Sequence, residues 1–284
     1  MRASRAEIIA FLSSRMEGLY PLPERQHIAR LVAAWLEGVD DTKYLIEPQD
    51  VVTIEQIETV AKELAAGRPL QYIIGSCDFC GLSISVGDGV LIPRPETEEL
   101  VMWAKHHAQT ISQPSILDLC TGSGCIALSL KSLIPSASIT AVELSDDAIS
   151  YAKKNSHDLS LDINIVKADV LQGLKELDGQ QFDIIISNPP YIPNAEIDTM
   201  RINVTHHEPH MALFVPDNDP LLFYRTIAIR AKELLSSRGA LFFEIHELLA
   251  DQTATMLREQ GYEITLRHDY FDKPRMICCQ RAKL

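Results

Sequence analysis

The sequence has no long uninterrupted apolar stretch. Its apolar runs end well before the roughly 20 residues that a helix needs to cross a bilayer. The N-terminus also lacks the apolar core of a secretory signal peptide. We therefore expect a cytoplasmic protein without a membrane partner.

Basic residues are scarce relative to acidic ones. The chain has 26 lysines and arginines against 39 aspartates and glutamates, a formal net charge of -13, and no run of basic residues. Proteins that bind long nucleic acids usually carry a basic patch, because phosphate neutralisation supplies most of the affinity. The charge balance therefore argues against a direct nucleic-acid partner.

Only one pair of the six cysteines has the spacing of metal ligands. Cys77 and Cys80 form a CxxC motif, and no second pair with suitable spacing accompanies it. Reduced, packed thiols in a cytosolic protein account for the cysteines better than a zinc site does. We expect no metal.

The N-terminal part, residues 1–70, is predicted to be a small helical bundle. Its apolar residues recur at a period close to 3.6, and its third helix is expected to begin at Thr53 as the N-cap. The alternation in "LSISV" and the surrounding glycines predict a β-hairpin linker over residues 71–92. The bundle either holds a partner or only stabilises the fold.

Strands and helices alternate through residues 93–284. This alternation predicts an α/β domain with a mostly parallel sheet covered by helices. The last two strands follow one another directly, which predicts an antiparallel edge. The expected strands are "SILDL", "SITAVEL", "INIVKAD", "FDIIIS", "GALFFEI", "YEITLRHDY" and "RMICCQRA".

The glycine-rich turn in "LDLCTGSGCIAL" lacks two common nucleotide signatures. It is not GxGxxG, and no lysine follows as in a P-loop, so a dinucleotide or a nucleoside triphosphate is not favoured. Gly122 and Gly124 still allow a ligand to approach the backbone closely. Taken alone, the turn is also compatible with a tight connection.

Two carboxylates extend this pattern. Glu143 ends the next strand about 20 residues later, where an acidic residue accepts hydrogen bonds from ribose hydroxyls. Asp169 ends the third strand and can receive an adenine amino group. An adenosine site without a pyrophosphate clamp indicates S-adenosylmethionine.

The stretch "ISNPPYIP" ends the fourth strand beside the expected cofactor site. A planar amide nitrogen is a weak nucleophile that must be held in line with a sulfonium methyl. Asn188 Oδ1 and the Pro189 carbonyl can accept its two N–H bonds, and Tyr191 can pack on the planar group. We predict an amide-binding site; a packed Asn-Pro turn is the structural alternative.

The ordered motifs "IPRPETEELV", "LDLCTGSGCIAL", "ISNPPYIP" and "EPHMALF" resemble those of HemK-like N5-glutamine methyltransferases of class 1 peptide chain release factors. The resemblance covers nearly the whole chain. It implies a Rossmann-like class I methyltransferase with a seven-stranded, mostly parallel sheet. It also implies S-adenosylmethionine as methyl donor and S-adenosylhomocysteine as product, with the glutamine of a Gly-Gly-Gln loop as acceptor.

The same resemblance assigns residues. Arg94 and Glu96 would close over the site, and Glu208 would order the loop after NPPY. The donor would be lined by Cys120, Thr121, Gly122, Ser123, Gly124, Glu143, Asp169, Val170 and Asn188, and the glutamine amide held by Asn188, Pro189, Pro190 and Tyr191.

Two departures from the family pattern carry expectations. Cys120 stands where glycine is common, so the backbone there is expected to avoid a glycine-only conformation. The stretch "FFEIHELLADQ" replaces a usual Glu-His-Gly and is expected to lie far from the amide site.

Three rival functions stay open on the sequence alone. An amino-methyltransferase acting on adenine or guanine in DNA or RNA shares NPPY but would need a basic surface. A non-catalytic adaptor is disfavoured by the intact Glu143 and NPPY. A Rossmann oxidoreductase is disfavoured by the missing GxGxxG.

Overall fold

The computed structural model describes residues 2–46, 52–53 and 55–282. The chain divides into two compact units. One comprises Met1–Ser76 with Arg201–His207, and the other Cys77–Met200 with Glu208–Leu284. The functional boundaries predicted at residues 70 and 92 stay a prediction.

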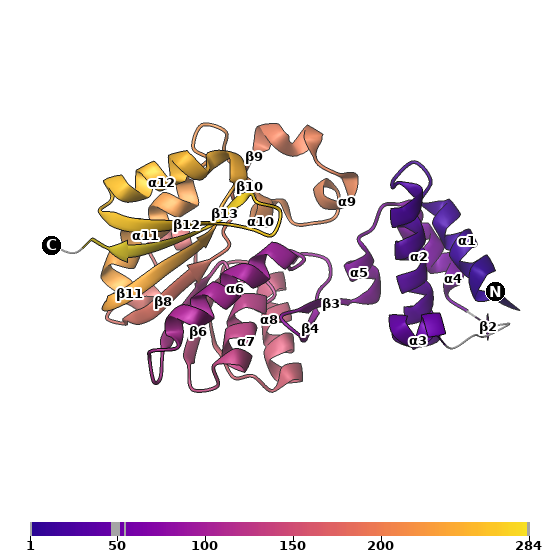
Figure 1. The fold of residues 1–284 in the computed structure, drawn as a ribbon, viewed down its shortest axis with the longest axis horizontal. Helices are drawn as coiled ribbons and strands as arrows, with labels where there is room; N and C mark the ends of the chain where they lie inside the picture. Colours follow the sequence, from indigo (N-terminus) through magenta and orange to yellow (C-terminus); the bar gives the residue numbers. More distant parts are fainter. Residues whose placement is uncertain (1, 47–51, 54, 283–284) are drawn as a thin grey trace. The chain divides into compact units, whose positions relative to one another are not determined.

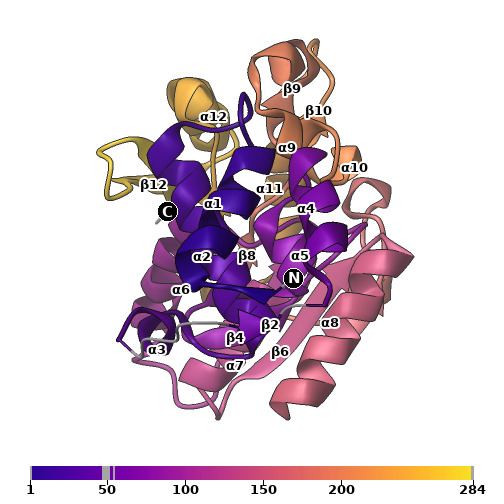
Figure 2. The same cartoon turned by 90° about the vertical axis from the view of Figure 1, so that its right-hand side faces the viewer.

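The smaller unit is a helical bundle (Figures 1 and 2). Ser4 begins the first helix with a capping box, in which its side chain and that of Glu7 bond each other's backbone N–H groups. Apolar side chains at helical spacing form its core, among them the buried Ile8, Leu12 and Val32. Its helices are α1 (Arg5–Arg15), α2 (Leu22–Glu37), α3 (Asp41–Ile46), α4 (Ile57–Ala65), α5 (Leu70–Ile74) and α9 (Ile202–Thr205).

Two local predictions for this region need correction. Helix α4 begins at Ile57 after Gln56, because Thr53 lies in the short strand β2 (Val52–Thr53), which pairs with β1 (Arg2–Ala3). Helix α5 occupies the start of the predicted linker. The hairpin itself consists of β3 (Ser76–Phe79) and β4 (Leu82–Ser85).

The hairpin turn has the backbone of a type I′ connection. Its two central residues, Cys80 and Gly81, have φ values of 50° and 77°. Two successive positive φ angles match the twist of the flanking strands, which is why two-residue hairpins favour this turn.

The larger unit is built on a seven-stranded sheet with the order β12-β13-β11-β8-β5-β6-β7. The predicted mostly parallel sheet is confirmed. The predicted antiparallel edge is also confirmed, because the last two strands, β12 and β13, pair antiparallel at one edge of the sheet, with β13 between β12 and β11. The strands are β5 (Ser115–Leu119), β6 (Ser138–Glu143), β7 (Asn164–Lys167), β8 (Phe182–Ser187), β11 (Leu235–Glu244), β12 (Tyr262–His268) and β13 (Pro274–Arg281).

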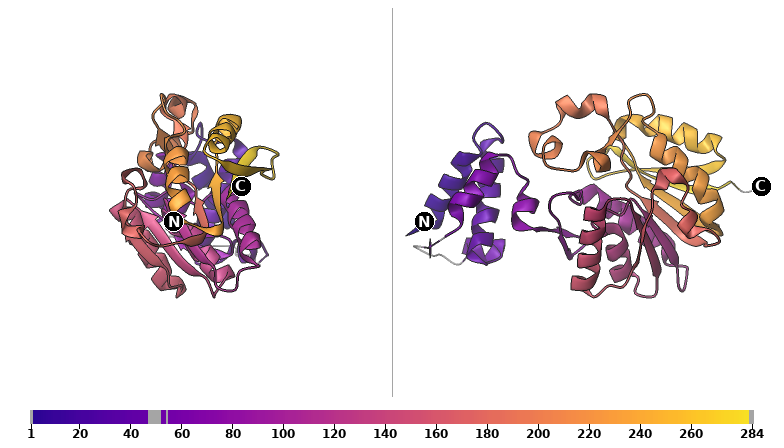
Figure 3. Two further views of the ribbon diagram at one scale, coloured as in Figure 1. Left: turned by 90° about the vertical axis from the view of Figure 1, so that its left-hand side faces the viewer. Right: turned by 180° about the vertical axis from the view of Figure 1, so that it is seen from behind.

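Helices cover both faces of this sheet, and the layers can be followed from the side and from behind in Figure 3. One face carries α6 (Pro95–Ala108), α7 (Cys125–Leu133) and α8 (Asp146–Leu159), and the other α11 (Leu222–Leu234) and α12 (Ala250–Glu259) (Figure 1). The central strands are therefore largely apolar, as "FDIIIS" and "SILDL" are, with one aspartate in each. Among the described residues, no helix is long and apolar enough to cross a membrane.

The parallel strands bring their carboxyl ends to one edge of the sheet. Leu119 pairs with Val142 on one side and with Ser187 on the other. The segments that follow β5, β6, β7 and β8 therefore meet at this edge, where open α/β sheets bind ligands.

Candidate active site

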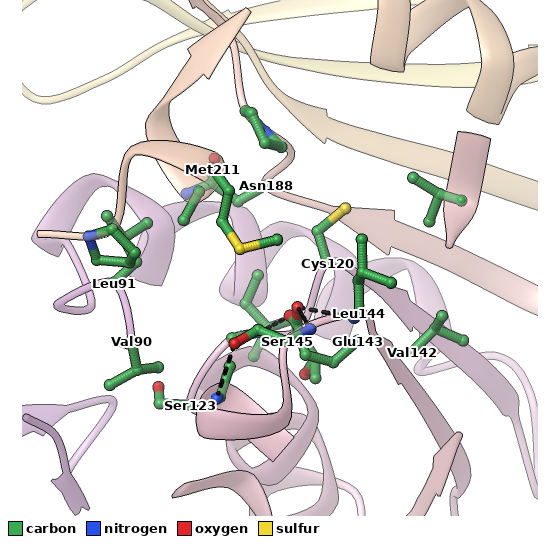
Figure 4. Close-up of a pocket in the computed structure, with 18 of the residues that line it drawn as sticks. Val90, Leu91, Cys120, Ser123, Val142, Glu143, Leu144, Ser145, Asn188 and Met211 are labelled. Atoms are coloured by element: carbon green, nitrogen blue, oxygen red, sulfur yellow. Dashed lines mark hydrogen bonds between the residues drawn. The ribbon is translucent and has the colours of Figure 1, made fainter. Parts of the chain in front are cut away.

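A cavity of about 350 Å³ lies at this edge of the sheet (Figure 4). Its walls come from the glycine-rich turn, the ends of the parallel strands, the segment before α6 and the segment after NPPY. Of the predicted site residues, Arg94, Cys120, Thr121, Gly122, Ser123, Glu143, Asp169, Val170, Asn188 and Pro190 line it. Glu96, Gly124, Pro189 and Tyr191 are not among the lining residues.

The glycine-rich turn follows a left-handed path. Cys120, Gly122 and Gly124 have φ values of 60°, 56° and 81°. The expectation for Cys120 was wrong, because its backbone keeps the conformation that favours glycine. A Cβ on Gly124 would lie 3.3 Å from Ala152 Cβ and from Leu128 Cδ1, so this glycine lets α7 and α8 pack closely.

The Glu143 carboxylate is fixed by backbone donors. Oε2 accepts from Gly122 N at 2.8 Å, and Oε1 accepts from Leu144 N at 2.8 Å and from Ser145 N at 3.0 Å. A carboxylate offers about four lone-pair sites, so these bonds leave acceptor capacity on the cavity side. The glycine-rich turn and the end of β6 are thereby held together around one negative charge.

The end of β7 supplies a second carboxylate. Asp169 Oδ1 accepts from Leu171 N at 2.9 Å and caps the short 3₁₀ turn that follows. This bond orients the side chain at the cavity wall beside the buried Val170.

Asp118 supports the turn from inside the protein. Its fully buried carboxylate accepts from Thr121 Oγ1 at 2.5 Å and from Ala127 N at 3.2 Å. Burial raises the pKa of Asp118 to about 7, against the lowering effect of these hydrogen bonds. Asp118 does not line the cavity.

The NPPY segment is tied to a buried carboxylate that the sequence reasoning missed. Asn188 Nδ2 donates to Thr97 Oγ1 at 3.2 Å, and Thr97 Oγ1 donates to Glu244 Oε2 at 2.6 Å. Tyr191 donates to Glu244 Oε1 at 3.0 Å. Burial raises the pKa of Glu244, while that of Tyr191 is raised by burial and by the Glu244 charge.

The stretch "FFEIHELLADQ" therefore does not lie far from the amide site, and that expectation was wrong. Glu244 bonds Tyr191 directly, and the His246 ring lies edge-on to the Tyr191 ring with centroids 5.9 Å apart. His246 Nδ1 accepts from Leu248 N, so Nε2 carries the proton toward Glu196 at 3.2 Å. A carboxylate ending an apolar strand, the signal that singled out Glu143, also marks Glu244.

Arg94 and Glu208 connect the segment before α6 with the segment after NPPY. Arg94 Nη2 lies 2.5 Å from Glu208 Oε1, and Glu208 Oε2 accepts from Ile92 N at 3.1 Å. Glu208 thus holds the PRPETE segment in place, and Arg94 lines the cavity.

The cysteine pair lies outside the cavity. All six cysteines are free, and burial raises the pKa of Cys77 and that of Cys80 to about 11. Thiols with such pKa values are poor nucleophiles and poor metal ligands at neutral pH. Within the described residues, no group of three histidine, cysteine or acidic side chains could hold a metal ion.

Two family models match this chain. Residues 7–75 match the PrmC N-terminal domain, and residues 101–207 match the Methyltransferase small domain.

Similar proteins extend these matches over most of the chain. A release factor glutamine methyltransferase of Flavobacterium psychrophilum is 44% identical, over 80% of this chain and 81% of its own. One of Bacteroides thetaiotaomicron is 36% identical, over 96% of this chain and 99% of its own. Among solved structures, a human methyltransferase 10 domain containing protein has a TM-score of 0.52 and 21% identity, and the match covers 72% of this chain and 90% of that chain. The last comparison concerns the fold alone.

Proposed function

This chain belongs to the release factor glutamine methyltransferases, and we propose that it methylates the glutamine of the Gly-Gly-Gln motif in class 1 peptide chain release factors. The methyl group comes from S-adenosylmethionine and goes to the side-chain amide nitrogen. The products are N5-methylglutamine and S-adenosylhomocysteine. The observation that carries the proposal is the position of Asn188 in the same cavity wall as Glu143 and the glycine-rich turn.

The residues of the cavity fit an adenosyl ligand. Glu143 keeps acceptor capacity for the ribose hydroxyls, and Asp169 ends the neighbouring strand where an adenine amino group can donate. Apolar side chains, including Val142, Val170 and Phe223, supply surface for a flat base. Bound there, S-adenosylmethionine would supply an electrophilic methyl group on a sulfonium.

The NPPY segment would hold the acceptor amide. Asn188 uses Nδ2 on Thr97, which leaves Oδ1 to accept one N–H of the glutamine amide. The Pro189 carbonyl would accept the other, since the two prolines restrict the backbone. Such positioning contributes up to about 7–11 kcal/mol in favourable intramolecular reactions. Both acceptors also favour the positive charge that develops on nitrogen.

Mass spectrometry of a class 1 release factor after incubation with enzyme and S-adenosylmethionine tests this function. We expect a single added methyl group on the glutamine of Gly-Gly-Gln. The Asn188→Ala variant should lose on the order of 100-fold or more in turnover, with donor binding still measurable. Methylation at another residue, or full activity of Asn188→Ala, would contradict the proposal.

The same assay should include single-stranded DNA and RNA as acceptors. An adenine or guanine amino-methyltransferase would methylate them and bind with a steep salt dependence. The formal net charge of -13 favours a protein acceptor instead. Arg94 and Glu96 are proposed to contact that acceptor, and a cytoplasmic location remains our expectation.

A further inference from the structure

Asn188, Thr97, Glu244 and Tyr191 form one hydrogen-bonded chain with a single carboxylate at its centre. We propose that Glu244 and Thr97 are positioning residues that fix which end of the Asn188 carboxamide faces the methyl acceptor. This inference rests on the proposed function and deepens it, because it assigns a task to two residues that do not touch the reacting atoms.

The hydrogen bonds of this series have a defined direction of donation. An ionised carboxylate has no proton and can only accept hydrogen bonds. Glu244 therefore requires Thr97 to donate at 2.6 Å and Tyr191 to donate at 3.0 Å. Burial raises the pKa of Glu244, and the hydrogen bonds from Thr97 and Tyr191 and the charge of Arg275 oppose that rise and favour the ionised form.

The direction in which Thr97 donates determines the orientation of Asn188. The single hydroxyl proton of Thr97 is committed to Glu244, so its oxygen has only lone pairs left for Asn188. The group of Asn188 that faces Thr97 at 3.2 Å must therefore be the NH₂ group. The carboxamide oxygen then faces away from Thr97 and is available to the acceptor amide.

The opposite orientation would not support the reaction. A carboxamide turned by 180° would present its NH₂ group to the N–H of the glutamine amide, donor against donor. The amide would lose an acceptor in the cavity, and the developing positive charge would lose a stabilising dipole. Without Thr97 or the Glu244 charge, the energy difference between the two orientations of Asn188 largely disappears.

Burial makes the arrangement rigid. Thr97 is 3% exposed and Glu244 is 1% exposed, so bulk water competes little for their hydrogen bond. The two residues come from the first turn of α6 and the last position of β11. The register pairs Phe243 with Ser187, which places Glu244 beside the start of NPPY.

The experiment compares Thr97→Val, Thr97→Ser and Glu244→Gln in the full chain. Steady-state methylation of a class 1 release factor gives kcat and KM, titration with S-adenosylhomocysteine gives the donor-site Kd, and thermal unfolding gives Tm. We expect Thr97→Val and Glu244→Gln to lower kcat on the order of 10- to 100-fold, with KM and Kd within about twofold of the wild type. Thr97→Ser keeps the hydroxyl and should retain kcat within about threefold.

The double variant Thr97→Val with Glu244→Gln separates a shared path from two independent roles. Both changes interrupt one chain, so the double variant should lose no more than the worse single variant. A double variant whose loss in kcat equals the product of the two single losses would overturn the inference. So would a Thr97→Val enzyme with wild-type kcat, or a Thr97→Ser enzyme as impaired as Thr97→Val.

The outcomes also separate this inference from the proposed function. A wild-type enzyme that leaves the release factor unmethylated would refute the function itself. If the wild-type enzyme methylates it and Thr97→Val is fully active, only the proposed role of the hydrogen bonds through Thr97 and Glu244 is refuted. If Glu244→Gln does not fold, the comparison of Thr97→Val with Thr97→Ser decides alone.

Discussion

Arg94 and Glu208 form an ion pair, with 2.5 Å between Nη2 and Oε1, across 114 positions of the chain. The Glu208 side chain is 1% exposed and that of Arg94 is 32% exposed. The carboxylate also accepts from Ile92 N, so one buried charge holds both ends of the turn that enters α6.

Arg94→Ala should destabilise the protein more than Glu208→Gln does. Arg94→Ala leaves a buried carboxylate with one backbone donor and should lower the free energy of unfolding by about 1–3 kcal/mol, less than for a fully buried pair. Glu208→Gln removes the charge but keeps an oxygen for Ile92 N. Urea unfolding of both variants measures the difference.

The double variant of this pair is the control. Glu208→Gln should restore part of the stability that Arg94→Ala removes, because no unpaired charge then remains. A double variant whose loss equals the sum of the single losses would show that the two side chains act independently.

Glu143→Ala should weaken binding of the methyl donor. The carboxylate is held by the N–H groups of Gly122, Leu144 and Ser145 and has about one lone pair left, on Oε2, to offer to the ribose. Losing charge-assisted hydrogen bonds of about 1.5–3 kcal/mol corresponds to roughly 10- to 100-fold in Kd. Calorimetric titration with S-adenosylhomocysteine measures it.

Asp146→Ala provides the matched control, since its exposed carboxylate lies near the same strand end and pairs with Lys167. That variant should bind the donor as the wild type does. If Glu143→Ala lowers Tm but leaves Kd unchanged, Glu143 orders the turn without contacting the donor.

The positions of the glycine-rich turn, Glu143, Asp169 and NPPY could be predicted because each lies at the end of a strand or within two residues after it. Parallel strands place their carboxyl ends at one edge of the sheet, so such residues share that edge. Sequence order alone was sufficient for this part of the site.

The partnership of Glu244 with Tyr191 could not be read in the same way. It requires β11 to pair with β8, and strands β9 (Ile192–Pro193) and β10 (Phe214–Val215) with helix α11 separate the two along the chain. Strand order depends on which helix covers which face, and local sequence does not encode it. The prediction for Cys120 failed for another reason. The residue type shows that a left-handed backbone would be unfavourable there, but it does not show whether the surrounding structure compensates for that strain.

Cys120→Gly should give a more stable protein than Cys120→Ala. Both substitutions remove the thiol, so their difference isolates the backbone at φ 60°. A Cβ costs about 1–2 kcal/mol in this region, partly offset by the greater entropy of glycine in the unfolded chain. We expect a net advantage for glycine of about 0.5–1 kcal/mol in urea unfolding. An alanine variant that is the more stable of the two would contradict the left-handed backbone.

Deleting Met1 to Ala66 should impair methylation of a folded release factor more than that of a free Gly-Gly-Gln peptide. A helical unit that holds the partner matters only for the folded substrate. We expect kcat/KM to fall at least about tenfold further for the folded substrate, a difference of about 1.4 kcal/mol. Equal losses in kcat/KM for both substrates would show that the unit only stabilises the fold.

The deletion needs its own control, because Arg201–His207 belongs to the same compact unit. Arg201 pairs with Glu24 at 2.6 Å, so the deletion also removes contacts of the segment after NPPY. Arg201→Ala breaks this pair and keeps the helices. This variant should change kcat/KM for both substrates by the same small factor.

Asp118 should make the folded protein less stable as pH rises from about 4 to about 7. Its pKa is raised from 3.8 to about 7, mainly because the carboxyl is buried. Between these values the folded state binds a proton that the unfolded state has released. The contribution is therefore fully present below pH 3.8 and is lost as pH rises through the folded pKa.

Asp118→Asn isolates this contribution, because every other titrating group is common to both proteins. Without ligand, the difference in unfolding free energy between variant and wild type should shift toward the variant by up to about 4 kcal/mol between pH 4 and pH 8. The constant cost of the amide cancels in this comparison. A flat difference, or one that favours the wild type as pH rises, would show that Asp118 is ionised in the folded protein throughout this range.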